Sequence, residues 1–434
     1  MAEIRDGLRA PQAEANCALL SSIHSEDRSP AGAEPIAGSS ARFQTGTGPL
    51  KVVHYLPRLC REDGGLFRAV IDLARGVAAL GHKVTLLSWD DRDLEQEKPP
   101  SSGWTSVVIK PPFPRHHSSP LGVSALMQAA RALRNADVVH LHGPWYPSNL
   151  QISMLADRMG VPYGVSLHGM LDDWSMTQKA YRKRIYHALV ARRFLDHATW
   201  VHCSTQSERA QASQWFLGTR AAVLPNPVDL ELFASLDGGA RARQELGLAE
   251  GAPFTVLFLG RLHKKKGLEL LLDATAVARA GGLLVDVLVA GTSEDPEYMR
   301  SLQRKVVELG LQGQVHFLGF VSGPTKTSLY QCADLVATPS WQENFGYVQV
   351  EALACGTPVV TSKIDFSEEL ESSGGAEIVE RDPRSLAAAI SSLCADDGRR
   401  REMGARGRSW AMETFGGNGA CARFVSLYRG QRHA

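Results

Sequence analysis

The chain lacks the features that mark secreted and membrane-spanning proteins. Its seven cysteines, at positions 17, 60, 203, 332, 355, 394 and 421, are scattered and form no Cys-x-x-Cys pair. This pattern argues against a disulfide framework or a zinc site and favours a reducing compartment. No apolar run is long enough to span a bilayer, and residues 17–20 are too short for the apolar part of a signal peptide. The sequence predicts a soluble, cytoplasmic protein and leaves peripheral contact with the inner face of the membrane open.

An excess of charge of one sign is also missing. The 434 residues include 47 Lys and Arg against 46 Asp and Glu, so the net charge is +1. Because electrostatic binding to nucleic acid needs a surplus of positive charge, we expect no nucleic-acid partner. The hydrophobic fraction of 44% is that of a globular protein, and the length predicts two domains.

Apolar runs alternate with amphipathic segments along most of the chain. Residues 1–48 have no such periodicity and are predicted to be a disordered extension. Predicted strands and helices then alternate from 51–56 to 220–224, which indicates an N-terminal domain at 49–228. A second series begins at 254–259 and indicates a C-terminal domain at 229–415, followed by a segment at 416–434. Such alternation predicts α/β domains with doubly wound, Rossmann-like parallel sheets.

The most informative stretch contains two acids, Glu343 and Glu351, with seven residues between them. The loop Asn344-Phe345-Gly346 opens a predicted helix, whose first N–H groups can bind an anion. One carboxylate could then hold hydroxyls of a sugar and the other those of a ribose. Glu343 could instead be a simple helix-start acid. Glu351 lies inside an apolar helix, where a buried carboxylate needs a partner that a ribose diol would supply.

Basic residues follow the predicted strand at 254–259, at the end where ligands of α/β sheets collect. Arg261 and Lys266 could stabilise a diphosphate leaving group without a metal ion. The alternative is a solvated basic turn, and we expect the intervening Lys264 and Lys265 to face solvent. Asp91 and Asp93 form an Asp-x-Asp pattern in a charged loop, where solvated carboxylates are the preferred interpretation.

Glycines and histidines give weaker signals at the other predicted strand ends. Gly64 and Gly65 precede the first helix and either admit a phosphate or form a plain turn. His168 follows the strand at 162–167 and either positions a substrate or is a core residue with satisfied hydrogen bonds. His140 and His142 end the neighbouring strand, but their spacing does not match a helical zinc motif. We therefore predict no metal site.

Residues 175–195 are predicted to form one long helix. Tyr181, Ile185, Leu189 and Phe194 have helical spacing and are expected to pack on the sheet. The basic residues among them either form a solvated face or attract anionic lipid or a lipid-linked acceptor.

Taken in order, these motifs resemble the family 4 glycosyltransferases, retaining enzymes of the GT-B fold. The resemblance covers roughly residues 50–430 and depends on five motifs: Gly64-Gly65, His168-Gly169, Pro225 to Asp229, Gly260 to Gly267, and the Glu343/Glu351 pair. It implies two Rossmann-like domains facing a central cleft, with the last segment crossing back to the first domain. Pro227, where glycine is usual, and the segment after Val360-Thr361, where a glycine pair is typical, depart from the pattern.

The resemblance also implies an activity. The chain would move a hexosyl group from a nucleoside-diphosphate sugar to a saccharide or lipid-linked acceptor, with retention and without a cofactor. Glu343 and His168 would contact the transferred sugar, Glu351 the ribose, and Gly64 and Gly65 the donor phosphates and the acceptor. The expected setting is exopolysaccharide, lipopolysaccharide or other glycoconjugate biosynthesis. A nucleotide-sugar 2-epimerase and a non-catalytic nucleotide-sugar sensor are the alternatives.

Overall fold

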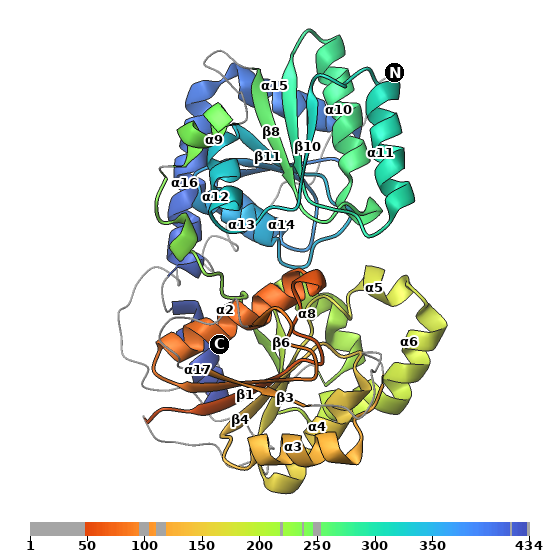
Figure 1. The fold of residues 1–434 in the computed structure, drawn as a ribbon, viewed down its shortest axis with the longest axis vertical. Helices are drawn as coiled ribbons and strands as arrows, with labels where there is room; N and C mark the ends of the chain where they lie inside the picture. Colours follow the sequence, from red (N-terminus) through yellow and green to blue (C-terminus); the bar gives the residue numbers. More distant parts are fainter. Residues whose placement is uncertain are drawn as a thin grey trace, which may run out of the picture.

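The structure is a computed structural model that describes residues 48–94, 104–109, 119–217, 220–236, 238–245, 253–416 and 419–431. Apart from Gly48, the predicted disordered extension lies outside the described residues. Two α/β domains stand one above the other in Figure 1. Each has a parallel sheet, which confirms the predicted fold class. None of the helices in the described part is both long and apolar enough for a membrane crossing.

The N-terminal domain contains a seven-stranded sheet of order β3-β2-β1-β4-β5-β6-β7. Its strands are β1 (Lys51–Tyr55), β2 (Lys83–Ser88), β3 (Trp104–Val108), β4 (Val138–His142), β5 (Tyr163–Ser166), β6 (Trp200–Cys203) and β7 (Ala221–Val223). The main helices between them are α2 (Gly65–Ala79), α3 (Val123–Leu133), α4 (Pro147–Met159) and α8 (Gln206–Ala212). Parallel strands covered on both faces read as continuous apolar runs, which is why the sequence located them.

The C-terminal domain repeats this architecture with a six-stranded sheet of order β10-β9-β8-β11-β12-β13. Its strands are β8 (Phe254–Leu259), β9 (Val285–Ala290), β10 (Val315–Gly319), β11 (Leu335–Thr338), β12 (Val359–Ser362) and β13 (Ala376–Val379). Its helices are α9 (Gly239–Glu245), α10 (Leu268–Ala280), α11 (Pro296–Glu308), α12 (Gly323–Cys332), α13 (Tyr347–Ala354), α14 (Ser367–Ser372), α15 (Pro383–Ala395) and α16 (Asp397–Phe415).

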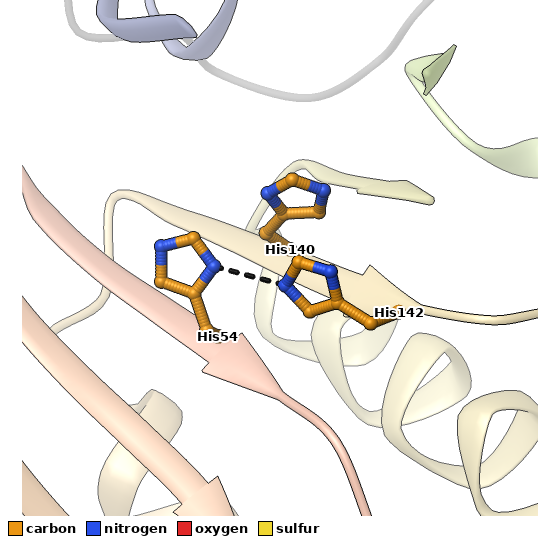
Figure 2. A group of neighbouring side chains, drawn as sticks. All are labelled: His54, His140 and His142. Atoms are coloured by element: carbon orange, nitrogen blue, oxygen red, sulfur yellow. Dashed lines mark hydrogen bonds between the residues drawn. The ribbon is translucent and has the colours of Figure 1, made fainter. Parts of the chain in front are cut away.

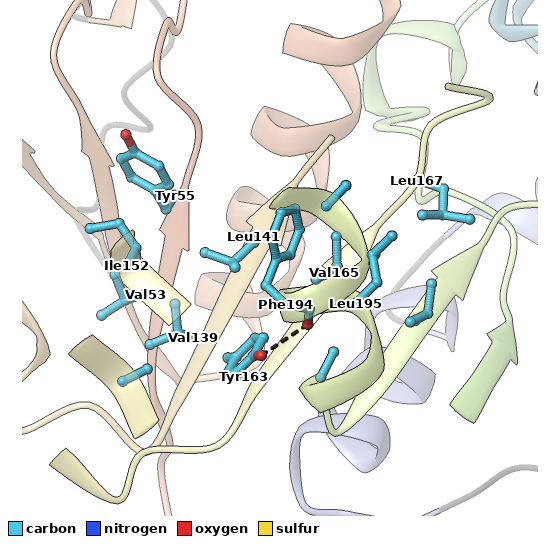
Figure 3. Close-up of a cluster of buried hydrophobic side chains, with 14 of the residues drawn as sticks. Val53, Tyr55, Val139, Leu141, Ile152, Tyr163, Val165, Leu167, Phe194 and Leu195 are labelled. Carbon is cyan, nitrogen blue, oxygen red and sulfur yellow. Dashed lines mark hydrogen bonds between the residues drawn. The ribbon is translucent and has the colours of Figure 1, made fainter. Parts of the chain in front are cut away.

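The core of the N-terminal domain packs the apolar face of the sheet against helices (Figure 3). Val139, Leu141 and Val165 from the central strands meet Phe194 in this cluster. The hydroxyl of Tyr163 donates a hydrogen bond of 2.9 Å to the carbonyl of Phe194, so the phenol is buried without losing a partner. This packing fixes the strand ends that carry polar side chains.

The last helix, α17 (Gly419–Tyr428), packs on the N-terminal domain. It appears in blue among the elements of the lower domain in Figure 1. Phe424 and Tyr428 are buried in one cluster with Leu56 and Trp200. A Cβ at Gly76 of α2 would lie 2.1 Å from the Cys421 sulfur, so only glycine allows the two helices this close approach.

The predicted helix at 175–195 is divided in the structure. It consists of α5 (Asp173–Thr177), α6 (Ala180–Tyr186), the π-helical turn η4 (His187–Ala191) and α7 (Arg192–His197). Lys179, between α5 and α6, has a positive φ of 54°, which interrupts the helix.

The prediction that the apolar residues of this segment pack on the sheet is wrong for three of the four. Tyr181, Ile185 and Leu189 are 78%, 41% and 61% exposed, whereas Phe194 is buried. Their spacing of four residues places the three exposed side chains on one helical face. Phe194 lies on the opposite face, together with the buried His187 and Ala191, and that face packs on the domain.

Candidate active site in the cleft between the domains

A cleft of ≈ 980 Å³ lies between the two domains. It is lined by nine of the ten predicted site residues: Gly64, Gly65, His168, Arg261, Lys266, Glu343, Asn344, Phe345 and Gly346. The tenth, Glu351, is buried in α13. The motifs are up to 282 residues apart along the chain (Gly64 to Gly346), and the fold brings them to one place.

Lys266 and Glu343 form an ion pair at the floor of this cleft, between Nζ and Oε1. The hydroxyl of Ser340 donates to the same carboxylate oxygen at 3.0 Å. Burial by itself would raise the pKa of Glu343, but the ammonium of Lys266, the Ser340 hydroxyl and the charge of Lys265 together outweigh it and hold that pKa below its usual range. Glu343 is therefore ionised at neutral pH, and its charge is balanced by Lys266.

Arg261 lies opposite the N-terminus of α2. Gly64 has φ 60° and ψ −121°, and a Cβ there would lie 3.8 Å from Arg261 Nε. The N-cap residue of α2 is Gly64, which has no side chain to cap the helix, so within the described part of the chain the first N–H groups of α2 stay open to the cleft. A guanidinium, an ammonium and a helix N-terminus thus face one space, which is an arrangement suited to a diphosphate.

The prediction that Lys265 faces solvent is wrong. Its side chain is half-buried, lines the cleft, and places Nζ 4.5 Å from the ring centroid of Trp174 in the other domain. Burial lowers the pKa of Lys265. The short 3₁₀ turn η8 (Lys264–Lys266) explains the difference, because consecutive residues of such a turn point in different directions. Lys264 is exposed, as expected.

Glu351 has partners inside the protein. Its two carboxylate oxygens accept hydrogen bonds from Lys326 Nζ at 2.6 Å and from the Tyr330 hydroxyl at 2.8 Å. Both partners come from α12, which sequence reasoning did not connect with α13. The buried carboxylate therefore does not need a ribose as its partner, contrary to the prediction, and the ribose contact itself stays a prediction.

The backbone at His168 is strained and held in place by a buried acid. His168 has φ 54°, which is uncommon for a non-glycine residue. The carboxylate of Glu208 accepts the N–H groups of Gly169 and Ser204, each at 2.5 Å. Sequence reasoning missed Glu208, although Thr205-x-x-Glu208 is a capping-box pattern that marks the start of α8.

Three histidines of the N-terminal domain lie together (Figure 2). His54, His140 and His142 are buried, and their ligand atoms lie within 4.8 Å of one another. The sequence drew attention to His140 and His142 but missed His54. The pairing of β1 with β4 sets His54 opposite His140, and strand order cannot be read from local patterns.

The geometry of these histidines favours hydrogen bonding over metal binding. His140 uses Nδ1 for the Tyr428 hydroxyl at 2.9 Å and Nε2 for Ser166 at 2.6 Å. The rings of His140 and His142 stack with centroids 4.2 Å apart, so their nitrogen lone pairs do not converge on one point. An ion here would have to displace these hydrogen bonds. The absence of a metal from the function stays a prediction.

A second cavity of ≈ 750 Å³ adjoins the cleft and shares Arg261 and Glu294 with it. Gly291, Phe320 and Val321, near the ends of β9 and β10, line it. Sequence reasoning missed this cavity because glycine and apolar residues at strand ends carry no local signal. Its size is within the range of small-molecule sites.

Direct contacts join the domains around the cleft. Asn344 Nδ2 donates to Ser204 Oγ at 2.9 Å, and Gln342 donates to the buried Asp172. Asp365, in the segment that departs from the family pattern, accepts a hydrogen bond of 2.8 Å from Gln211. This segment thus contributes a contact between the domains.

Two parallel sheets whose carboxyl ends face a shared cleft are the architecture of the GT-B fold, and comparisons with known proteins identify the family. The family description "Glycosyltransferase Family 4" matches residues 63–232, and "Glycosyl transferases group 1" matches residues 241–410. The chain belongs to this family of glycosyltransferases.

Relatives cover most of the chain. A D-inositol 3-phosphate glycosyltransferase of Kineococcus radiotolerans is 28% identical over 85% of this chain and 91% of its own length. A GDP-mannose-dependent alpha-(1-6)-phosphatidylinositol monomannoside mannosyltransferase of Mycolicibacterium smegmatis is 28% identical over 81% and 92%. The crystal structure of Anabaena HepE with UDP-glucose superposes with a TM-score of 0.71 at 22% identity, covering 87% of this chain and 100% of HepE. This last likeness concerns the fold alone.

Proposed function

We propose that this glycosyltransferase moves a hexosyl group from a nucleoside-diphosphate sugar to a hydroxyl of a saccharide or lipid-linked acceptor. The observation that carries the proposal is the meeting of Arg261, Lys266 and the N-terminus of α2 beside an ionised Glu343 in one cleft. Phosphates suit the cations and the helix N-terminus, while a carboxylate suits sugar hydroxyls.

In the proposed reaction the bond between the sugar and the diphosphate breaks, and negative charge grows on the departing oxygen. Arg261 and Lys266 would stabilise that charge, so we propose that no metal is needed. Lys266 would exchange part of its interaction with Glu343 for the diphosphate, which frees the carboxylate for a sugar hydroxyl. Retention of the anomeric configuration is proposed by analogy with the family. A phosphate oxygen of the leaving group would accept the proton of the attacking hydroxyl.

The donor and the reaction can be tested together. Purified protein is screened with UDP-, GDP- and ADP-sugars by thermal shift, and those that bind are incubated with EDTA and candidate acceptors before mass spectrometry and NMR of the product anomer. We expect transfer with retention that EDTA does not abolish. Epimerised donor formed without acceptor would instead indicate the epimerase alternative.

A matched pair of variants tests the site. Lys266→Ala should lower kcat/KM about 100-fold or more, because a charge that stabilises the transition state is lost. Lys264→Ala, two residues away and exposed, should leave kcat/KM within about threefold. An equal loss of kcat/KM in both variants would contradict the proposed role of Lys266 in stabilising the transition state.

We also propose that the acceptor is reached at an anionic membrane surface. Tyr181, Ile185 and Leu189 are exposed on one helical face of the N-terminal domain. Between Trp174 and Leu195 the chain has six basic residues and no acid. Apolar side chains surrounded by basic ones match the headgroup region of anionic lipid, where each nearby cation contributes about 1 kcal/mol.

Vesicle sedimentation tests this surface. The protein should bind vesicles of 70% phosphatidylcholine and 30% phosphatidylglycerol, and bind pure phosphatidylcholine at least about tenfold less. Leu189→Ser should weaken binding, whereas Val307→Ser, at a site 59% exposed in the other domain, should not. Equal binding by both variants would refute the proposed surface.

A further inference from the structure

The buried histidines form a row of hydrogen bonds that ends at the cleft. His54 Nδ1 lies 3.0 Å from His142 Nε2, and His142 Nδ1 lies 3.0 Å from His168 Nε2. His54 and His142 are buried, and His168 lines the cleft. Figure 2 shows the first of these bonds. Neither the reaction scheme nor the fold accounts for a row of three imidazoles with this regular geometry.

The imidazoles in this row are neutral at physiological pH. Burial lowers the pKa of His54 and of His168 to about 3, and it lowers the pKa of His142 well below its ordinary value. A neutral imidazole carries one proton, so one ring nitrogen donates and the other accepts. Only two arrangements of protons satisfy both bonds, one running from His54 to His168 and the other in reverse.

The surroundings of His54, at the buried end of the row, determine which of the two proton arrangements is present. His54 Nε2 is buried and has no hydrogen-bond partner among the described residues. An orphaned buried N–H is rarer in proteins than an acceptor with an unused lone pair, so the proton of His54 belongs on Nδ1. His54 then donates to His142, His142 must donate to His168, and the remaining proton of His168 lies on Nδ1.

A second row of hydrogen bonds in the same sheet contains histidines of the other tautomer. The Leu224 carbonyl accepts from His202 Nε2 at 2.7 Å, so His202 Nδ1 accepts the hydroxyl proton of Ser166 at 2.7 Å. Ser166 in turn accepts from His140 Nε2, and His140 Nδ1 accepts from the Tyr428 hydroxyl. His140 and His202 therefore carry their protons on Nε2.

We propose that His54 and His142 are positioning residues that fix His168 as an N–H donor at the wall of the cleft. The Nδ1 of His168 has no hydrogen-bond partner within the described part of the protein, so it is available to an oxygen of a bound ligand. The ligand class is an oxygen acceptor, which under the proposed function is a hydroxyl or ring oxygen of the transferred sugar. Only this identification rests on the proposed function.

The protons can be observed directly in the full-length protein. Multiple-bond proton–nitrogen NMR of protein with labelled histidine distinguishes a protonated ring nitrogen from an unprotonated one. We expect His54, His142 and His168 to be protonated on Nδ1, and His140 and His202 on Nε2, with assignments from single variants. Protonation of His168 on Nε2 would overturn the proposal, whatever reaction the protein catalyses.

Two substitutions of His54 test the consequence. The amide of Asn lies near the position of imidazole Nδ1, so His54→Asn keeps a donor for His142, whereas His54→Leu removes it. We expect His54→Leu to give a mixture of His168 tautomers and a roughly tenfold lower kcat, and His54→Asn to keep the Nδ1 signal and a kcat within about threefold. The same loss in both variants with an unchanged His168 spectrum would refute the positioning role.

Discussion

The buried histidines predict that lowering the pH from 7.5 to 5.5 destabilises the N-terminal domain strongly. Burial keeps the pKa of His54 and His168 at about 3 and that of His202 at about 4, and it lowers those of His140 and His142 well below the ordinary value. In the unfolded chain the same residues titrate near 6.5. Between these values only the unfolded state binds protons, so stability is full above the unfolded pKa and falls as the pH drops below it.

The magnitude follows from the difference in bound protons. At pH 5.5 a histidine with a pKa near 6.5 is about ten-elevenths protonated, and its neutral folded counterpart therefore loses between 1 and 2 kcal/mol of stability. Five such residues together lose about 7 kcal/mol. This is comparable with the whole free energy of unfolding of an ordinary domain, which is about 5–15 kcal/mol.

Urea denaturation at half-unit steps between pH 7.5 and 5.5, followed by tryptophan fluorescence, measures this loss. The slope of the free energy of unfolding against pH should approach about four protons near pH 5.5. The five histidines contribute about ten-elevenths of a proton each. The buried Asp72, whose pKa burial raises to about 6, takes up most of one proton in the folded state and offsets part of this slope. His202→Gln keeps a donor for the Leu224 carbonyl and should lower the slope by about one proton. A slope of one proton or less would refute the view that these histidines are neutral when folded.

Three further outcomes are expected from the geometry. Gly64→Ala, at φ 60°, should destabilise the protein by about 1 kcal/mol and weaken nucleotide binding in calorimetry, because the α2 N-terminus must shift. Tyr428→Phe removes the donor to His140 and should cost about 1–3 kcal/mol in urea denaturation. Glu208→Gln replaces one of the two carboxylate oxygens with an NH₂ group, which cannot accept the backbone N–H groups that Glu208 binds, including that of Gly169. This variant should lower kcat/KM about tenfold with little change in far-UV circular dichroism.

Much of the fold and many residues of the cleft could be predicted from the chain because their signals are local, whereas the cleft itself was expected from the family resemblance. Buried parallel strands are continuous apolar runs in the sequence. The turn η8, which contains Lys266, follows one such run, and the loop with Glu343 follows another. Parallel strands bring their carboxyl ends to one edge of a sheet, so motifs that follow strands meet there. Lys266 and Glu343 are such a pair, 77 residues apart and joined in the structure.

The remaining features depend on which elements are neighbours. His54 joins His140 because β1 pairs with β4, and Glu351 finds Lys326 because α12 packs beside α13. Neither neighbour can be read from periodicity. Leu189 was wrongly predicted to be buried. Helical spacing identified the apolar face of its helix, but spacing alone does not tell whether such a face packs on the sheet or is exposed to solvent.

The two domains contribute different chemistry to the cleft, and this difference suggests an order of events. The C-terminal domain supplies the cations Arg261, Lys265 and Lys266, whereas the N-terminal domain supplies the backbone N–H groups of α2 and the neutral His168. The charged residues that the N-terminal domain adds to the lining are Arg58, Glu62 and Asp63, and their sum is negative. Cations attract a diphosphate over a longer range than neutral donors do. Under the proposed function, the C-terminal domain should therefore hold the nucleotide first. Contacts such as Asn344 to Ser204 would then bring His168 to the sugar, which makes the orientation of its N–H a condition of the closed state.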